Sequence, residues 1–413
     1  MTVANSQSIH RCRICGGERL QQFLTLGAQP HCNRFLRQDE LGSEPFYPLD
    51  VYFCHDCALV QLGHTVPREV MFLDHPYLSG TTRALTEHFS RLATRIVEQN
   101  RLSPQDLVID VGSNDGTWLN QFRRLGVGTL GVEPAAKIAQ LATREGIETV
   151  VDFFGSQVAA TIRKDKGPAT VITAAGVFFH VDDLHDFVSG VRTLLREDGV
   201  FIVQAMYLLD IVERCAFDSI YHEHLCYYSL RPLRVLFDSF DMEIFNAERI
   251  DIHGGSFVVY VGAKGAHPVT SVVSELLQLE EQHSLYSLRV FEEFADRVTH
   301  IKARLGELLA QLKTEGKRIS AYGASARGNT LLNSCRIGPD VLEYAAEKNP
   351  LKVGLYTPGM HIPVVADEHW HRDPPDYFLV LAWNFLDEFL AKERAYREQG
   401  GKFIVPVPEP RVI

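Results

Sequence analysis

The chain has 413 residues and a mass of 46.5 kDa, enough for about two to four domains. Hydrophobic residues make up 46% of it and charged residues 23%, proportions of folded globular proteins that exclude disordered, collagen-like and coiled-coil classes. The 52 Asp and Glu residues outnumber the 41 Lys and Arg residues, for a net charge of -11. This argues against a nucleic-acid-binding protein, because phosphates require a basic face.

The N-terminus shows no targeting segment. Residues 1–8 lack the basic start and apolar stretch of a signal peptide, and no later stretch approaches the roughly 18 consecutive apolar residues of a membrane-spanning helix. We therefore expect a cytoplasmic protein with no membrane partner and no nucleic-acid partner.

Half of the eight cysteines form two Cys-x-x-Cys pairs, Cys12 with Cys15 and Cys54 with Cys57. One such turn offers two thiolates to one metal, so two pairs predict a closed tetrahedral zinc site of structural type within about residues 8–65. A redox pair is the alternative interpretation. Four further residues lie close enough in the sequence to replace a ligand: His10, Cys32, His55 and His64.

After this module, apolar residues alternate between helical and strand periods. Residues 83–100 place four apolar side chains on one helical face: Leu85, Phe89, Leu92 and Ile96. Five short apolar runs follow, typical of buried parallel strands, at 107–111, 130–133, 148–151, 169–174 and 199–204. Helical patterns fill the intervals at 135–144, 155–164 and 184–195. This alternation predicts an α/β fold with a doubly wound sheet that binds its ligand at the carboxyl ends of the strands.

A glycine-rich turn follows the first of these strands. Asp110 precedes it, Gly112, Asn114 and Gly116 form it, and Glu133 ends the next strand. Dinucleotide-binding folds use such glycines for a tight turn and the second acid for ribose hydroxyls. Here the glycines depart from the Gly-x-Gly-x-x-Gly order, and an acid at the turn suits a ligand with an ammonium group better than a pyrophosphate.

This segment resembles the S-adenosylmethionine (SAM) methyltransferases. The resemblance implies that the glycine turn holds the methionine part of SAM and that Glu133 holds the ribose. It also implies that Asp152 and Phe153 lie beside the adenine. An NAD site and a structural turn without a ligand are the alternatives.

A dense polar cluster follows the fifth strand. Two histidines, one carboxylate and three tyrosines fall within eight positions: Tyr221, His222, Glu223, His224, Tyr227 and Tyr228. Buried His, Glu and Tyr all require polar partners, so this density is unusual for a core element. Imidazole titrates near neutral pH and a carboxylate can orient it, which favours general acid–base chemistry. A metal site and a polar network without a catalytic role are the alternatives.

The C-terminal third contains a second turn of a kind that attracts phosphate. A helical stretch near 269–313 precedes a strand at 318–322, and the turn at 323–328 then opens a helix. Backbone N–H groups at such a helix start favour a phosphate, and Ser325 and Arg327 add side-chain donors.

Taken in order, four motifs resemble the nucleotide-deoxysugar C-methyltransferases of bacterial natural-product and antibiotic pathways. They are the two Cys-x-x-Cys pairs, Asp-Val-Gly-Ser-Asn-Asp-Gly-Thr from residue 110, Tyr-His-Glu-His from residue 221, and Tyr-Gly-Ala-Ser-Ala-Arg-Gly-Asn-Thr from residue 322. The resemblance covers nearly the whole chain. It implies a zinc-binding module (1–70), a central Rossmann-like SAM-binding domain (71–260), and a second α/β Rossmann-like domain that holds a nucleotide-linked sugar (261–413).

The reaction implied by this resemblance is methylation of the carbon beside the keto group of a 4-keto sugar, commonly linked to thymidine diphosphate (dTDP). Five residues match catalytic or other active-site positions: His224, which we expect to be the base, and Glu223, Tyr221, Tyr77 and His180. The division of roles between His224 and His222 stays open. The residues expected to contact the substrate are His222, Ser325, Arg327, Asn349, Lys352 and His361.

The chemistry independently favours such a cluster. A carbon nucleophile beside a ketone requires a base and hydrogen-bond donors for the enolate oxygen. We expect SAM and a structural zinc ion as cofactors, and a monomer. The alternatives are an O- or N-methyltransferase, and a non-catalytic binding protein with a zinc module and a SAM fold.

Overall fold

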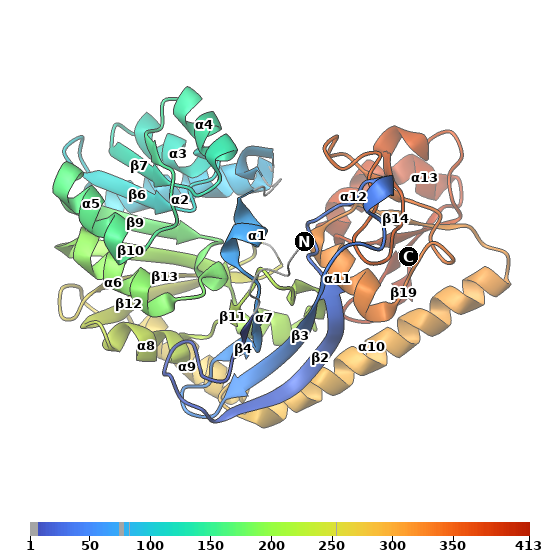
Figure 1. Ribbon diagram of the computed structural model, residues 1–413, viewed down its shortest axis with the longest axis horizontal. Coiled ribbons are helices and arrows are strands. Elements are labelled where there is room, and N and C mark those ends of the chain that lie inside the picture. The colour runs from blue at the N-terminus through green and yellow to red at the C-terminus, as the bar shows by residue number, and fades with distance from the viewer. Residues whose placement is uncertain (1–6, 74–77, 82, 253) are drawn as a thin grey trace.

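The computed structural model describes residues 7–73, 78–81, 83–252 and 254–413. Figure 1 shows two α/β lobes side by side, one formed by the middle of the chain and one by its C-terminal third. A long helix and a curved two-stranded ribbon run between them along one edge. Among the described residues, no helix has the length and apolar character needed to cross a membrane.

The N-terminal module is an antiparallel sheet in the order β11-β4-β3-β2. Its strands are β2 (Leu20–Pro30), β3 (Phe46–Cys54), β4 (Val60–Leu62) and β11 (Cys226–Tyr227). Because β11 directly follows the polar cluster at 221–224, that cluster is tied to the sheet of the N-terminal module. Three further elements complete the module: β1 (Gln7–Ser8), which pairs with β5 (His64–Thr65), and helix α1 (Arg68–Phe72).

Strands β2 and β3 form the curved ribbon, which we call the arm, with residues 31–45 as its tip. The arm lies along the long helix α10 (Leu288–Thr314), where Phe291 packs between Phe23 and Phe53 at ring distances of 5.2 and 5.3 Å. At the tip, Leu36 exchanges backbone hydrogen bonds of 3.0 and 2.8 Å with Tyr356. The arm therefore extends from the N-terminal module to the C-terminal lobe.

The central sheet has the order β12-β13-β10-β9-β6-β7-β8, with β13 antiparallel to both its neighbours. Its strands are β6 (Leu107–Val111), β7 (Gly128–Val132), β8 (Thr149–Val150), β9 (Ala169–Ala175), β10 (Leu195–Met206), β12 (Met242–Ile250) and β13 (Ser256–Ala263). The five strands predicted from the sequence correspond to β6 to β10, and the predicted doubly wound fold is confirmed. The domain boundary expected at residue 260 falls inside β13.

Alternate residues of these strands face two separate cores, as the two-residue period of a strand requires. Val108 and Val171 belong to the core under α2 and α3, whereas Ile109 and Ile172 belong to the core on the opposite face. All four apolar side chains predicted on one face of α2 are buried. The helices of this domain are α2 (Arg83–Gln99), α3 (Thr117–Arg124), α4 (Ala136–Arg144), α5 (Ser156–Lys166), α6 (Leu184–Leu194), α7 (Leu208–Glu213) and α8 (Leu230–Asp238).

The C-terminal lobe contains a second sheet, in the order β16-β15-β14-β17-β18-β19, in which only β19 pairs antiparallel. Its strands are β14 (Ile319–Tyr322), β15 (Ala345–Glu347), β16 (Val364–Ala366), β17 (Tyr377–Val380), β18 (Lys402–Val405) and β19 (Arg411–Val412). Its helices are α11 (Ala326–Cys335), α12 (Leu386–Lys392) and α13 (Arg394–Glu398). The second α/β domain expected from the sequence is therefore present.

The connection between the lobes differs from the expected single helical stretch. It consists of two helices, α9 (Ser271–Gln282) and α10, because Ser284 adopts a left-handed conformation with φ of 57° that ends the first helix. Ser287 then caps the start of α10. Short 3-10 helices lie at η1 (Gln38–Glu40), η2 (Ser79–Thr81), η3 (Phe178–His180), η4 (Phe217–Ser219), η5 (Asp367–His369) and η6 (Trp383–Phe385).

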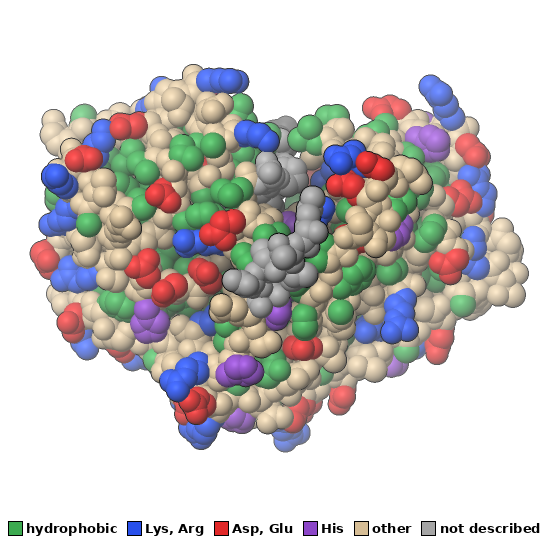
Figure 2. All heavy atoms as spheres, viewed as in Figure 1, with side chains coloured by type: hydrophobic (Ala, Val, Ile, Leu, Met, Phe, Trp, Pro, Cys, Tyr) green, Lys and Arg blue, Asp and Glu red, His purple; other side chains and the backbone are tan. Residues whose placement is uncertain are grey.

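The surface charge follows the composition. On the face drawn in Figure 2, Lys and Arg side chains are interspersed with Asp and Glu. Both signs of charge are therefore present on this face, in a chain whose net charge is -11. A polyanionic ligand must therefore be held by local donors and not by the field of the whole molecule.

Candidate active site

The two Cys-x-x-Cys pairs come together in the N-terminal module. The Sγ atoms of Cys12 and Cys57 lie 3.5 Å apart, those of Cys15 and Cys54 lie 3.6 Å apart, and all four fall within 4.8 Å of one another. A tetrahedral zinc ion with Zn–S bonds of about 2.3 Å requires sulfurs about 3.8 Å apart. The four sulfurs are therefore close enough together to bind one zinc ion. Within the part of the chain that the structure describes, no other group of His, Cys, Asp or Glu meets this criterion.

Local backbone geometry explains this convergence. Each pair spans a tight turn, in which Gly16 and Ala58 donate their backbone N–H to the carbonyls of Cys12 and Cys54 at 3.0 and 2.9 Å. Gly16 has a φ of 69°, a conformation that glycine adopts without strain. The residues considered as substitute ligands lie outside the cluster, and Cys32 lies instead at the arm tip.

A pocket opens at the carboxyl ends of β6, β7 and β9. Its lining includes five of the predicted cofactor residues: Gly112, Asn114, Glu133, Asp152 and Phe153. Gly112 has a φ of 69°, and a Cβ there would lie 2.4 Å from Val177, so the turn requires glycine. The pocket thus brings together the residues that the resemblance assigned to the methionine, ribose and adenine parts of SAM.

Asp110 and Gly116 are not among the described residues that line the pocket. Glycine at position 116 allows the turn to pack closely against Ala142 and Ile147, since a Cβ there would lie 3.1 Å from both. Asp110 lies buried beneath the turn and accepts a 2.6 Å hydrogen bond from the Thr173 hydroxyl. Burial raises the pKa of Asp110 to about 7, and the charge of Glu133 acts in the same direction.

Glu133 is positioned by the backbone around it. Its carboxylate accepts hydrogen bonds from the N–H groups of Asn114 at 3.0 Å and Ala135 at 2.9 Å. Burial raises the pKa of Glu133, and these two N–H groups oppose that effect. The carboxylate therefore links the glycine turn after β6 to the residues that follow β7.

Helix α1 supplies one wall of the pocket that sequence reasoning missed. The guanidinium of Arg68 lies 4.4 Å from the centre of the Phe153 ring, and the Phe72 ring lies 5.1 Å from that of His180. All four residues line the pocket. A helix of five residues carries no periodic signal long enough to be assigned from the sequence.

His224 lies behind this pocket with a defined tautomer. Its Nδ1 lies 2.8 Å from the carbonyl oxygen of Ser219, which can only accept, so Nδ1 carries the proton and Nε2 the lone pair. No described residue donates a hydrogen bond to Nε2. The rings of Tyr221 and His180 lie 3.8 and 5.3 Å from that of His224. Burial lowers the pKa of His224 well below its usual value, and His180 adds to this effect.

His180 and the polar cluster are held together by main-chain contacts. Nδ1 of His180 donates to the backbone oxygen of Glu223 at 2.5 Å, and Leu225 donates its N–H to the carbonyl of Phe179 at 2.8 Å. These contacts connect the pocket wall to the residue before His224. Tyr77, the remaining residue expected in the active site, lies outside the described residues.

His222 faces away from His224. Its Nε2 lies 3.2 Å from the carbonyl oxygens of both Tyr47 and Pro48, on β3 of the N-terminal module. Burial lowers the pKa of His222 to about 4. The structure therefore gives different surroundings to the two histidines whose division of roles the sequence left open, because His224 lies beside His180 and His222 lies against β3.

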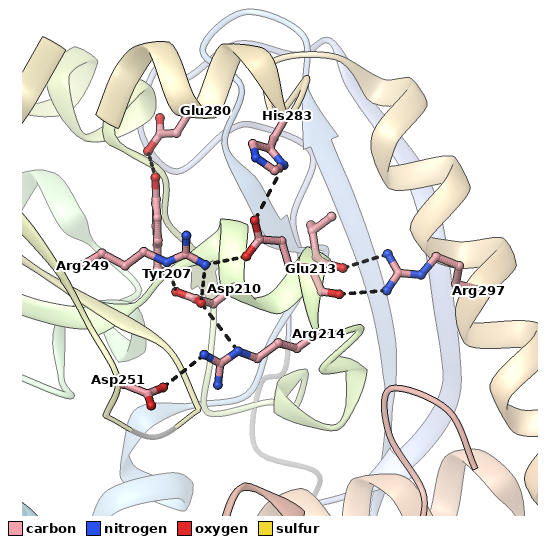
Figure 3. Close-up of polar contacts among 10 residues, drawn as sticks. Tyr207, Asp210, Glu213, Arg214, Arg249, Asp251, Glu280, His283 and Arg297 are labelled. Atoms are coloured by element: carbon pink, nitrogen blue, oxygen red, sulfur yellow. Dashed lines mark hydrogen bonds and ion pairs between the residues drawn. The ribbon is translucent and has the colours of Figure 1, made fainter. Parts of the chain in front are cut away.

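Helix α7, which precedes the polar cluster in the chain, is anchored from two sides, by β12 and by α10 (Figure 3). Arg249 of β12 binds Asp210 at 2.7 Å and also pairs with Glu213. Arg297 of α10 donates to the last carbonyls of the helix, those of Val212 and Glu213, at 3.0 and 3.1 Å. These ion pairs and hydrogen bonds hold the helix that precedes the polar cluster at 221–224.

The residues predicted to contact the substrate in the C-terminal lobe all make protein contacts. The Ser325 hydroxyl accepts from the N–H of Gly328 at 3.0 Å, which caps α11. Nε and Nη2 of Arg327 bind the carboxylate of Asp218 at 3.0 and 2.9 Å. His361 lies 2.5 Å from Glu44 of the arm tip. Arg327 and His361 thus join the C-terminal lobe to the rest of the molecule.

Lys352 and Asn349 lie at the carboxyl edge of the C-terminal sheet. Nζ of Lys352 donates to the carbonyl of Ala324 in the glycine turn at 2.7 Å and lies 4.8 Å from the centre of the Phe35 ring. Burial lowers the pKa of Lys352, and Glu347 opposes that effect. Asn349 donates its backbone N–H to Glu347 at 3.0 Å.

Glu347 repeats the role of Glu133 in the second domain. It ends the second strand of its sheet and accepts the N–H of Ala324, in the turn after the first strand, at 2.9 Å. An acid at the end of the strand that follows a glycine turn is the same order of residues that Glu133 shows in the sequence.

Three family models match the chain in succession. A zinc binding domain matches residues 12–72, a methyltransferase domain matches residues 77–246, and a C-methyltransferase C-terminal domain matches residues 251–408. With the cysteine cluster, these matches confirm the predicted zinc module and SAM-binding fold.

The chain is 35% identical over 407 residues to C-methyltransferase NovU of Streptomyces niveus. The aligned region covers 98% of this chain and 97% of that protein. Similar solved structures include magnesium protoporphyrin IX methyltransferase (ChlM) of Synechocystis PCC 6803 with bound SAM, at 10% identity and a TM-score of 0.33 over 43% of this chain and 79% of that one. The CcbJ methyltransferase of Streptomyces caelestis is similar at 14% identity and a TM-score of 0.34, over 43% and 90% of the two chains.

The cysteine cluster predicts the metal content of two variants. We expect Cys54→Ser to lose most of its bound zinc and to unfold at a lower temperature, since a closed site of four thiolates contributes directly to folding. Cys335→Ser, which lies outside the cluster, serves as the matched control and should retain one zinc ion per chain. Elemental analysis and thermal unfolding measure both effects. Full zinc content in Cys54→Ser would contradict the assignment.

The raised pKa of Asp110 predicts a pH dependence of SAM binding. SAM carries a sulfonium and an ammonium group, so its binding favours the ionised carboxylate of Asp110, whose pKa is about 7 in the free protein. The dissociation constant for SAM should therefore fall as the pH rises from about 6 to about 8. Asp110→Asn keeps an acceptor for Thr173 but cannot ionise, and should flatten this dependence. Calorimetric titration measures it; equal slopes for the two proteins would rule out the role of Asp110.

Proposed function

The chain belongs to the C-methyltransferase family and is a SAM-dependent enzyme, and on this premise we propose that it methylates the carbon beside the keto group of a nucleotide-linked 4-keto deoxysugar, with dTDP as the expected nucleotide. The observation that carries the proposal is the position of His224. A buried imidazole with its lone pair on Nε2 lies 5.3 Å, ring to ring, from His180, which lines the SAM pocket.

Carbon methylation requires a base of this kind. The proton beside a ketone is too weakly acidic to leave unaided at neutral pH. Because the pKa of His224 is lowered by burial, the imidazole is neutral at pH 7 and can accept that proton at Nε2. The Ser219 carbonyl accepts the hydrogen bond from Nδ1–H, so Nε2, on the opposite side of the ring, is directed away from Ser219. When bound, SAM supplies an electrophilic methyl group on its sulfonium.

Tyr221 is suited to stabilise the enolate oxygen. Its ring lies 3.8 Å from that of His224, and burial raises its pKa well above the usual value. The hydroxyl therefore stays protonated and remains a hydrogen-bond donor when negative charge develops on the ketone oxygen. In this arrangement His224 removes the proton, Tyr221 donates to the oxygen and His180 positions the reacting groups at the pocket wall.

The nucleotide belongs, in this proposal, to the C-terminal lobe. Glu347 and the turn at 323–328 repeat the relation between Glu133 and the SAM-binding turn, an arrangement that suits a second nucleoside. Lys352 lies against the same turn. In a protein with a net charge of -11, this cation and the backbone N–H groups of the turn are the groups suited to the diphosphate.

The base assignment predicts the loss of hydrogen exchange in His224→Asn. The Asn amide keeps a donor for the Ser219 carbonyl but removes Nε2. With a 4-keto sugar nucleotide in deuterated water, we expect both exchange at the adjacent carbon and methyl transfer to fall by about a hundredfold or more. Mass spectrometry of a panel of nucleotide-linked 4-keto sugars, incubated with and without SAM, measures both steps.

The matched control is His222→Gln, in which the amide nitrogen takes the place of Nε2 against the carbonyls of Tyr47 and Pro48. We expect this variant to retain most of the wild-type rate. Methyl transfer to oxygen or nitrogen, with no exchange at carbon, would overturn the proposed reaction.

The nucleotide site predicts a selective effect of Lys352→Met. Methionine matches the apolar stem of lysine without its charge, so we expect the KM for the sugar nucleotide to rise about tenfold, the loss of one charged hydrogen bond. The dissociation constant for SAM should stay unchanged because Lys352 lies in the other lobe. Steady-state kinetics and SAM calorimetry separate the two effects, and an equal loss of SAM affinity would contradict this placement.

A further inference from the structure

The arm tip ends against the side chain of Glu223. Nε2 of His31 lies 2.8 Å from Oε1 of Glu223, and the Asn33 amide donates to the same oxygen at 2.7 Å. His31 and Glu223 are 9% and 4% exposed. The contact joins distant parts of the chain, since His31 and Glu223 are 192 positions apart in the sequence.

The tip cannot shift freely relative to Glu223, because the C-terminal lobe holds it from the other side. The side-chain amide of Asn329 on α11 donates to the carbonyl of Cys32 at 2.7 Å. Gln29, at the end of β2, donates to the Ser334 hydroxyl at 2.8 Å. The C-terminal lobe therefore fixes the backbone between His31 and Asn33, whereas Glu223 belongs to the central part of the chain.

Glu223 is in turn connected to the proposed base. It precedes His224 in the chain, and its own carbonyl accepts the hydrogen bond from His180. Burial lowers the pKa of His224, and the negative charge of Glu223 opposes that effect. A carboxylate held at this position stabilises the imidazolium that forms when His224 accepts a proton.

We propose that His31 and Asn33 are positioning residues for the methyl transfer, which act by holding the carboxylate of Glu223 in place beside His224. A buried carboxylate requires donors to remain ionised, and two N–H donors on one oxygen both stabilise its charge and fix its direction. The N-terminal module thus contributes to catalysis through its arm tip, without contacting the reacting atoms. This inference rests on the proposed function, in which His224 is the base.

Two amide substitutions at residue 31 test the contact. In His31→Gln the amide nitrogen reaches the place of Nε2 and keeps the donor, whereas the shorter side chain of His31→Asn does not reach it. We expect kcat to fall about tenfold to a hundredfold in His31→Asn, the effect of one hydrogen bond to a charged group, and His31→Gln to recover most of it. Asn33→Leu, which has the same shape but no donor, should also lower kcat, with the KM for the sugar nucleotide and SAM affinity little changed.

A double-mutant comparison separates positioning from simple docking of the domains. We expect His31→Asn combined with Glu223→Gln to be no slower than Glu223→Gln alone, because both changes act on one contact. Gln38→Ala removes an exposed contact of the arm tip with Tyr356 and should leave kcat unchanged. A similar loss of kcat in Gln38→Ala, or independent losses in the double mutant, would show that arm docking alone matters.

A spectroscopic measurement tests the contact without any substrate. In protein labelled with nitrogen-15 at histidine, the Nε2 proton of His31 is identified by its loss in His31→Gln. We expect Glu223→Gln to shift this signal upfield, since an amide oxygen is a weaker acceptor than a carboxylate. An unchanged signal overturns the contact.

The outcomes distinguish this inference from the function on which it rests. If no 4-keto sugar nucleotide is methylated by the wild-type protein, the proposed function fails, while the histidine signal still decides whether the contact exists. If Glu223→Gln is slow but His31→Asn and Asn33→Leu match the wild type, the positioning role is overturned and the proposed function stands.

Discussion

The cost of burying ionisable side chains in one short segment governs how this protein is assembled. Four such residues lie within seven positions and are nearly inaccessible to solvent: Asp218, His222, Glu223 and His224. Each requires a polar partner, and no single domain supplies them all. Arg327 of the C-terminal lobe pairs with Asp218, the backbone of β3 accepts from His222, the arm tip binds Glu223, and only His224 finds its partner within the segment. The segment 218–224 therefore takes its polar partners from all three parts of the chain.

This requirement gives a physical reason for the long arm and the long helix α10. The arm must cross from the zinc module to the C-terminal lobe, and α10 runs beside it over that distance (Figure 1). The Phe291 ring of α10 packs against the rings of Phe23 and Phe53 at 5.2 and 5.3 Å, so the helix supports the ribbon at its base. The zinc cluster closes the base of the same sheet, which means that metal binding and the geometry of the arm belong to one structural unit.

The two α/β lobes use the same local device for different purposes. In each, a carboxylate at the end of the second strand accepts backbone N–H groups from the turn after the first strand, through Glu133 in one lobe and Glu347 in the other.

The sequence indicated the Glu133 arrangement because its glycines and acids follow a recognisable order. The Glu347 arrangement follows the same order, since Glu347 ends β15 and bonds the turn after β14. Helix α1 and the break between α9 and α10 were missed because both depend on segments too short for a periodic pattern.

The sequence by itself determined the features whose signals are local. Cysteine spacing predicted the zinc module, and strand and helix periods predicted the doubly wound sheet. The order of glycines and acids predicted residues that line one pocket at the carboxyl ends of its strands. Only the tertiary structure showed that His222 contacts the backbone of β3 whereas His224 lies beside His180. It alone placed His31 against Glu223 and Arg327 against Asp218. The physical reason is that spacing along the chain encodes contacts within a turn or a strand pair, whereas the partners of a buried charge are set by how distant segments pack.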